Sequence, residues 1–375
     1  MNESRHSGGG SGSWELIVQP GERVAPLLEA IGQAKKRVEI LIFRFDKREI
    51  EEALVACVKR GVAVTALIAW TNSGGERSLR SLETRLLAAG VTVSRTADDL
   101  TRYHGKMLII DRKRLYLLAF NFTSIDIDSS RSFGVSTTSR ILVDDAVRLF
   151  EADCGRQPFT PSKGGLLVSP INAREEITRF ISDAKKELLI YDPCVSDPRI
   201  VRLLEDRASA GVQVRILGSL KGSRGAIAAR PLADMRLHTR TIVRDDCDAF
   251  LGSQSLRTAE LDGRREIGAF LSCRAVVAEM KRNFEADWSL TDTADEKASA
   301  LSGDKLAKKI AKAISKELPP ITEVVQAVTA RMPANAVDLS GIDMPALEET
   351  IRSAVKTVVK ESFEEAAADA AQGAG

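Results

Sequence analysis

Short apolar runs alternate with helix-like stretches along most of the chain. The first apolar run, residues 38–43, is followed by Ile50 and Leu54, which share one face of a helix. This helix is expected to end at Gly61, because glycine suits the left-handed position after a helix, and the β-branched run 62–68 predicts a second strand. The order strand, helix, strand predicts an α/β fold.

The same order of segments occurs a second time, so an internal repeat organises the chain. The apolar run 188–191 is followed by Ile200 and Leu204 at helical spacing and then by the β-branched run 212–217. Later segments also correspond, with 131–134 matching 265–268 and 150–153 matching 284–287. The repeat predicts two α/β lobes with largely parallel or mixed sheets.

The repeat and the changes in composition predict five segments. They are a disordered Gly/Ser-rich leader at 1–13, a first lobe at 14–154, a linker at 155–165, a second lobe at 166–291 and a helical extension at 292–375. The leader lacks the apolar core of an export signal. No stretch approaches the run of about 18 apolar residues that a membrane span requires.

Composition narrows the class of protein. Apolar residues make up 44% of the chain, which is enough to build two cores, and a net charge of +2 gives no overall attraction to nucleic acid or membrane. The five cysteines are scattered without CxxC spacing, which argues against both a disulfide framework and a zinc site. A cytoplasmic protein is expected.

Two of the three histidines begin the same pattern. His104-Gly105-Lys106 is followed by Asp111, and His238-Thr239-Arg240 is followed by Asp245, whereas His6 lies in the leader. If each motif lies on a strand, its histidine and its cation project from one face. Such a pattern at both internal histidines is unlikely to be accidental, and each lobe is expected to offer an imidazole beside a fixed cation.

These motifs resemble those of the phospholipase D superfamily, whose members carry two copies of HxKxxxxD, each followed by a GSxN-type segment. The resemblance implies two α-β-α sandwich lobes with mixed sheets, related by pseudo-twofold symmetry, with one phosphodiester site between the two histidines. It also implies a phosphohistidine intermediate and a reaction that needs no metal or other cofactor. The helical C-terminal extension has no counterpart in this resemblance.

The resemblance also implies a role for each site residue. One histidine of His104 and His238 attacks phosphorus while the other protonates the leaving group, which suits imidazoles with an ordinary pKa of about 6.5. The groups expected to bind phosphate oxygens are Lys106, Asn121, Arg240 and Ser253. Asp111 and Asp245 are expected to tie hairpins together rather than to act in catalysis.

The chain departs from the family pattern at several positions. Arg240 replaces a lysine, Ala119 stands where the first GSxN-type segment has serine, and Ser255 stands where the second has asparagine. Glu266, 28 residues after His238, is expected to orient that histidine, whereas the same spacing from His104 gives Ser132. Asp126 or Asp128 is the proposed substitute beside His104.

The expected function is a metal-independent phosphodiesterase acting on phospholipid by hydrolysis or transfer. A basic amphipathic helix at Lys305 to Lys316 favours lipid slightly, and two placements of it stay open: docked on the rest of the protein with its lysines in solvent, which is preferred, or in peripheral contact with a membrane. A nuclease that binds nucleic acid through Arg77, Arg80, Arg85 and Arg102 is one alternative. A degenerate phosphate-binding protein or scaffold is the other, and the chain is expected to be a monomer.

Overall fold

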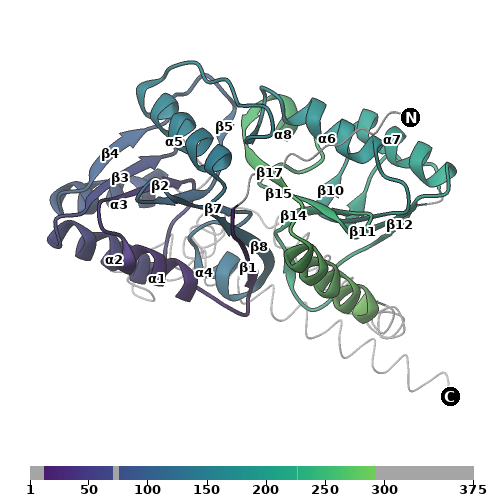
Figure 1. Ribbon diagram of the computed structural model, residues 1–375, viewed down its shortest axis with the longest axis horizontal. Coiled ribbons are helices and arrows are strands. Elements are labelled where there is room, and N and C mark those ends of the chain that lie inside the picture. Colours follow the sequence, from purple (N-terminus) through teal and green to yellow (C-terminus); the bar gives the residue numbers. More distant parts are fainter. Residues whose placement is uncertain (1–11, 71–75, 226, 292–375) are drawn as a thin grey trace, which may run out of the picture. The chain divides into compact units, whose positions relative to one another are not determined.

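The computed structural model describes residues 12–70, 76–225 and 227–291. It confirms a mixed α/β protein with two lobes (Figure 1). The Lys305 to Lys316 helix and the rest of the predicted extension lie outside the described residues. No helix of the described ranges is long and apolar enough to cross a bilayer.

The first lobe begins with alternating strands and helices, and its later strands pair mostly antiparallel. In chain order its elements are β1 (Trp14–Gln19), α1 (Ala25–Gln33), β2 (Arg37–Ile42), α2 (Arg48–Lys59), β3 (Ala63–Ile68), α3 (Glu76–Ala88), β4 (Thr92–Arg95), β5 (Arg102–Tyr103), β6 (Met107–Ile110), β7 (Arg114–Leu118), α4 (Ser124–Asp128), β8 (Ser130–Thr137) and α5 (Arg140–Gly155).

The second lobe repeats this order with a shorter connection before its histidine. Its elements are β9 (Leu167–Val168), α6 (Ala173–Ser182), β10 (Glu187–Val195), α7 (Pro198–Ser209), β11 (Gln213–Leu220), β12 (Ala228–Arg230), β13 (Arg236–Leu237), β14 (Arg240–Arg244), β15 (Asp248–Gly252), α8 (Thr258–Asp262), β16 (Arg264–Arg265) and β17 (Ile267–Leu271). A final helix follows at residues 274–291.

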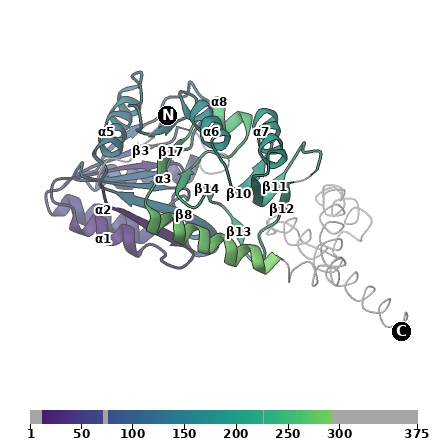
Figure 2. The same cartoon turned by 45° about the vertical axis from the view of Figure 1, so that its right-hand side comes forward.

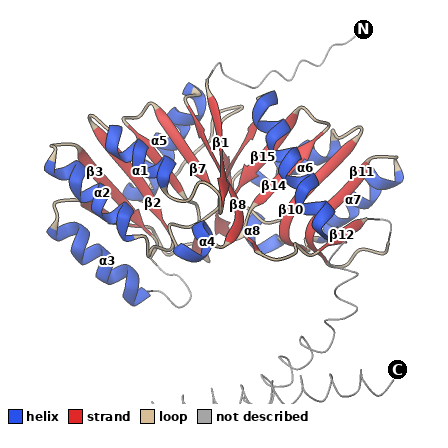
Figure 3. Cartoon of the chain, turned by 90° about the horizontal axis from the view of Figure 1, so that it is seen from below, coloured by secondary structure: helices blue, strands red, loops and turns tan. Residues whose placement is uncertain are grey.

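The strand orders of the two sheets correspond one to one. The first sheet has the order β1-β8-β7-β6-β2-β3-β4, and the second has β9-β17-β15-β14-β10-β11-β12 when it is read from the matching edge. Figure 3 shows the sheets side by side, with β8 of the first next to β14 and β15 of the second. The internal repeat of the sequence is therefore a repeat of structure.

Apolar side chains of the described residues form three clusters. The outer face of the first sheet packs under α1, α2 and α3, and the outer face of the second packs under α6, α7 and α8 (Figure 2). The third cluster joins the inner faces of both sheets with α5 and the helix at 274–291. Because this inner core is shared, burial of apolar surface holds the two lobes together.

The helices end at the predicted glycines, and the hairpins turn at the predicted aspartates. Helix α2 stops before Gly61 and α7 before Gly211, and both glycines have the left-handed φ values, 81° and 89°, that end a helix cheaply. The hairpin between β6 and β7 turns at Asp111, and its counterpart between β14 and β15 turns at Asp245.

The two motif aspartates hold these hairpins against the start of a neighbouring strand. The Asp111 carboxylate accepts backbone N–H bonds from Lys35 (2.9 Å), Lys36 (2.7 Å) and Arg37 (2.9 Å). Asp245 binds the backbone of residues 185–187 in the same way. Each aspartate lies at the far end of its strand from the histidine, so its contacts belong to the fold.

We predict that Asp111→Ala lowers the free energy of unfolding by about 1–2 kcal/mol, because three backbone N–H groups lose their acceptor. Asp111→Asn keeps one acceptor oxygen and tolerates the left-handed backbone, so its loss should be smaller. Urea unfolding of both variants followed by circular dichroism measures the difference. Equal stability of Asp111→Ala and the unmodified chain would contradict this assignment.

Candidate active site

Each motif histidine is held by the backbone of the opposite lobe. Strand β5, just before His104, pairs in parallel with β16, and β13, just before His238, pairs in parallel with the start of β8. The Arg265 carbonyl accepts a hydrogen bond from His104 N (2.7 Å), and the Arg131 carbonyl accepts one from His238 N (3.0 Å). The two lobes therefore exchange short strands at the site.

Two ion pairs between the lobes reinforce this exchange. The Arg131 guanidinium binds both carboxylate oxygens of Asp287 at 2.7 and 2.9 Å, and the buried Tyr191 hydroxyl donates to the same carboxylate at 2.6 Å. At the related position, Arg265 lies 3.2 Å from Asp153. These ion pairs thus hold Arg131 and Arg265 in place, and the backbone carbonyl groups of the same two residues bind the histidine backbones.

His104 is oriented by a carboxylate of the second lobe. Its Nδ1 lies 3.0 and 2.8 Å from the two Glu266 oxygens, and its ring packs edge-on against Phe43 with centroids 4.5 Å apart. The prediction that Glu266 orients His238 was wrong. Residues 28 apart in one lobe do not meet, because the strand exchange carries Glu266 to the other lobe's histidine.

His238 has a weaker partner. Its Nδ1 makes no hydrogen bond among the described residues, and the Asp126 Oδ2 atom lies 3.5 Å away as an ion-pair contact. Placing Asp126 or Asp128 beside His104 was therefore wrong, since Asp128 instead forms an ion pair with Lys47 at 2.6 Å.

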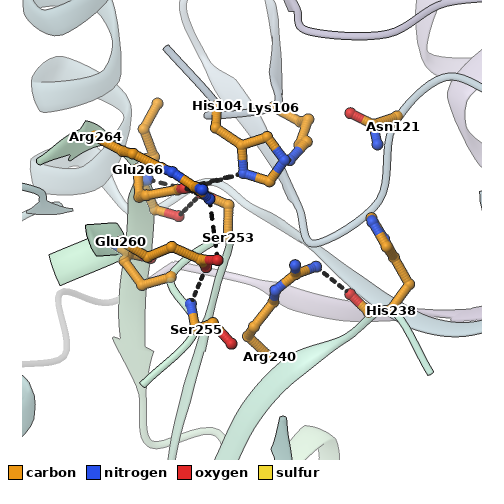
Figure 4. A network of polar contacts seen from close by, with 12 residues as sticks. His104, Lys106, Asn121, His238, Arg240, Ser253, Ser255, Glu260, Arg264 and Glu266 are labelled. Carbon is orange, nitrogen blue, oxygen red and sulfur yellow. Dashed lines mark hydrogen bonds and ion pairs between the residues drawn. The ribbon is translucent and has the colours of Figure 1, made fainter. Parts of the chain in front are cut away.

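The two motif cations are buried beside the histidines. The Lys106 Nζ atom lies 2.8 Å from His104 Nε2, although residues 104–106 precede β6 rather than lie on it. Arg240 donates from Nη1 to the His238 carbonyl at 2.6 Å, and its buried Nε has no partner within the described ranges. Figure 4 shows His104, Lys106 and Asn121 facing Arg240 and His238 across the site.

The predicted Asn121 and Ser253 are both buried in this network (Figure 4). The Asn121 amide donates to Asp126 at 2.6 Å, which leaves its Oδ1 as an unpartnered acceptor in the described part of the chain. Ser253 Oγ accepts from Ile267 N at 3.0 Å, and Ser255 Oγ donates to the buried Asp192. Both predicted residues therefore reach the site, already bound to protein groups.

Burial and neighbouring cations set the charge of the site. The pKa of His104 is well below its ordinary value because of burial and then the Lys106 charge, and burial and Arg240 lower the pKa of His238 in the same way. Burial lowers the pKa of Lys106 to about 7 and raises that of Glu266 to about 7. Burial and the neighbouring cations thus favour the neutral form of both imidazoles.

Several site residues escaped prediction. Glu260 accepts from Ser255 N at 2.8 Å and from Arg264 at 3.0 Å, and Arg236 binds Asp126 at 2.5 Å. Glu260 stands at the repeat position of Asp126, so alignment of the two copies is the signal that reveals it. Among the described residues no group of three histidine, cysteine, aspartate or glutamate side chains is arranged to bind a metal ion.

Comparison with curated proteins finds relatives that are named polyphosphate kinase. The chain is 26% identical over 313 residues to a polyphosphate kinase of Pseudomonas syringae pv. tomato, covering 72% of this chain and 41% of that protein. A polyphosphate kinase of Pseudomonas aeruginosa is 23% identical over 252 residues, covering 61% of this chain and 36% of that protein. The chain therefore spans less than half the length of these curated relatives.

Solved structures share the fold. A polyphosphate kinase of Porphyromonas gingivalis superimposes with a TM-score of 0.60 at 21% identity, covering 74% of this chain and 50% of that one. A phosphatidylserine synthase of Haemophilus influenzae superimposes with a TM-score of 0.58 at 13% identity, covering 72% and 85%.

The family model described as "Cardiolipin synthase, PLD-like domain" matches residues 27–154 and 177–288, which include both histidine motifs. That match covers more than half of the chain. The chain therefore belongs to the phospholipase D superfamily, as a member of this PLD-like domain family.

Proposed function

We propose that this protein transfers phosphoryl groups through a phosphohistidine at His104. The observation that carries the proposal is the pair of short contacts from Glu266 to His104 Nδ1. A carboxylate on Nδ1 fixes the proton there and leaves the Nε2 lone pair for attack on phosphorus. Lys106, now 2.8 Å from Nε2, is placed to move onto a phosphate oxygen when substrate enters.

His238 is the proposed acid and base. It faces His104 from the other lobe, and its low pKa arises from burial and from Arg240 and Lys106. A bound phosphate offsets these cations and favours protonation of His238, which then donates that proton to the leaving oxygen. In the second step the neutral imidazole takes a proton from the acceptor that attacks the phosphohistidine.

A phosphate chain is the substrate class that we propose first. The curated relatives are named polyphosphate kinase, and they align over up to 72% of this chain. Arg240, with an unpartnered buried Nε, offers a planar fork to a terminal phosphoryl group with several free oxygens. In this proposal His104 attacks the terminal phosphorus, and the bond to the bridging oxygen breaks.

A phospholipid phosphodiester is the second candidate, supported by the family description, which names cardiolipin synthase. The nuclease hypothesis loses support from the contacts of its arginines. Arg85 binds Glu51 at 2.7 Å and Arg80 binds Glu83 at 2.8 Å, so these charges already have acidic partners. The geometry around His104 also favours turnover over a degenerate binding protein, because nucleophile, carboxylate and cation are all in contact.

We predict that the purified chain acquires a base-stable, acid-labile label from ³²P-polyphosphate and that His104→Ala abolishes it. His238→Ala should label about 10²-fold to 10⁴-fold more slowly, because it lacks only the general acid. His6→Ala is the matched control and should label at the normal rate. Label in His104→Ala would overturn the assignment of the nucleophile.

The same assay separates the substrate classes. ³²P-phosphatidylglycerol vesicles replace polyphosphate in a parallel reaction with the same variants. Labelling from the vesicles alone would favour the phospholipid candidate, and labelling from polyphosphate alone would favour the phosphate chain. A folded protein that takes label from neither would contradict both.

We predict that kcat/KM falls as the pH rises through about 7, because Lys106, whose pKa burial lowers to about 7, loses the charge that binds phosphate. Burial raises the pKa of Glu266 to about 7 as well. The fall in kcat/KM therefore reflects the coupled titration of Lys106 and Glu266. In Lys106→Arg the guanidinium keeps its proton, and the fall should move to higher pH even if the maximum is lower. If kcat/KM of Lys106→Arg falls at the same pH as in the unmodified chain, Lys106 is not the source of the fall.

A further inference from the structure

The two histidines differ in the residue that stands at the position of the orienting carboxylate. Glu266 and Ser132 occupy equivalent positions of the repeat, each directly after the arginine whose carbonyl binds the opposite histidine. Glu266 reaches His104, but Ser132 has only a short hydroxyl, which is fully buried without a hydrogen-bond partner in the described ranges. The first lobe therefore has no carboxylate at this position.

A carboxylate nevertheless lies beside His238, supplied by a different element. Asp126 of α4 is 1% exposed, and its Oδ2 lies 3.5 Å from His238 Nδ1. The same oxygen accepts bonds from Asn121 N (2.9 Å) and Asn121 Nδ2 (2.6 Å), while Oδ1 accepts from Arg236 at 2.5 Å. Donors on both oxygens fix the direction of the Asp126 carboxylate.

We propose that Asp126 is the positioning residue of His238, taking over from α4 the task that Glu266 performs for His104. Its counterpart in the second lobe, Glu260, binds Ser255 N and Arg264, and Glu266 is left to orient the histidine. In the first lobe Asp126 alone takes both roles: it accepts the backbone N–H of Asn121 and stands beside the histidine. The value of this arrangement for catalysis rests on the proposed function, but the contact itself does not.

The physical consequence is a defined tautomer. Asp126 is the acidic side chain in ion-pair contact with His238, whereas the other charged groups that face the ring are cations: Arg236 and Arg240 of its own lobe and Lys106 of the first. A carboxylate beside Nδ1 favours a proton on that nitrogen, so Asp126 directs the Nε2 lone pair into the site. The competing explanation is that Asp126 serves only to bind Arg236.

Selective NMR can test this on the full-length chain without any turnover. The chain has only three histidines, so ¹⁵N-histidine labelling gives a spectrum in which each ring nitrogen can be assigned with His6→Ala and His104→Ala. At neutral pH we expect both His104 and His238 to carry their proton on Nδ1. In Asp126→Ala the Nδ1 proton of His238 should be lost in favour of Nε2, with His104 unchanged.

Matched variants distinguish the two explanations. Asp128→Ala, on the same helix and paired with Lys47, should leave the His238 tautomer unchanged, as should Arg236→Gln. Glu266→Ala should shift His104 and leave His238 as it was. If Arg236→Gln moves the His238 proton as Asp126→Ala does, Asp126 acts through Arg236 and the proposal is wrong.

The unmodified chain alone can also overturn the proposal, which guards against a variant that does not fold. A His238 proton on Nε2 in that chain, or an Nδ1 proton that persists in Asp126→Ala, would exclude Asp126 as its acceptor. Failure of the proposed function is separate, because it would appear as absence of a phosphohistidine while the tautomers remain as expected.

Discussion

The exchange of backbone hydrogen bonds between the lobes is the constraint on which the site depends. The carbonyl groups of Arg131 and Arg265 each hold the histidine of the opposite lobe, and both arginines are anchored by ion pairs to Asp287 and Asp153. A lobe by itself has a histidine but lacks the carboxylate that orients it. The site therefore exists only where the shared inner core brings the two sheets together.

The same enclosure decides the charge of the site. Removing ions such as Lys106 and Glu266 from water costs several kcal/mol each, by a rough estimate, unless partners compensate. Burial, and after it the charges of neighbouring cations, lowers the pKa values of both histidines and of Lys106. If the proposed phosphate substrate binds here, its negative charge offsets these cations, so substrate binding and protonation of the site are expected to be coupled.

The repeat made most of the fold predictable, because strands, helix ends and the hairpin aspartates follow local rules of periodicity and turn chemistry. The residues His104, Lys106, His238, Arg240 and Glu266 also converge as expected. The pairing of Glu266 could not be predicted, since spacing within one lobe contains no information on strands exchanged between lobes. Asp126 was misplaced for the same reason: its partner is fixed by the position of α4 against the second lobe.

In the proposed mechanism, departure from symmetry gives the two similar histidines different tasks. Glu266 contacts Nδ1 of His104 with both oxygens, whereas Asp126 shares its charge between Arg236 and His238 and stands farther away. A nucleophile gains from a fixed ring with a strongly held Nδ1 proton, while an acid and base must change its protonation state in each half of the reaction. A looser, partly neutralised carboxylate suits the second task, so the loss of a carboxylate at Ser132 is consistent with specialisation rather than decay.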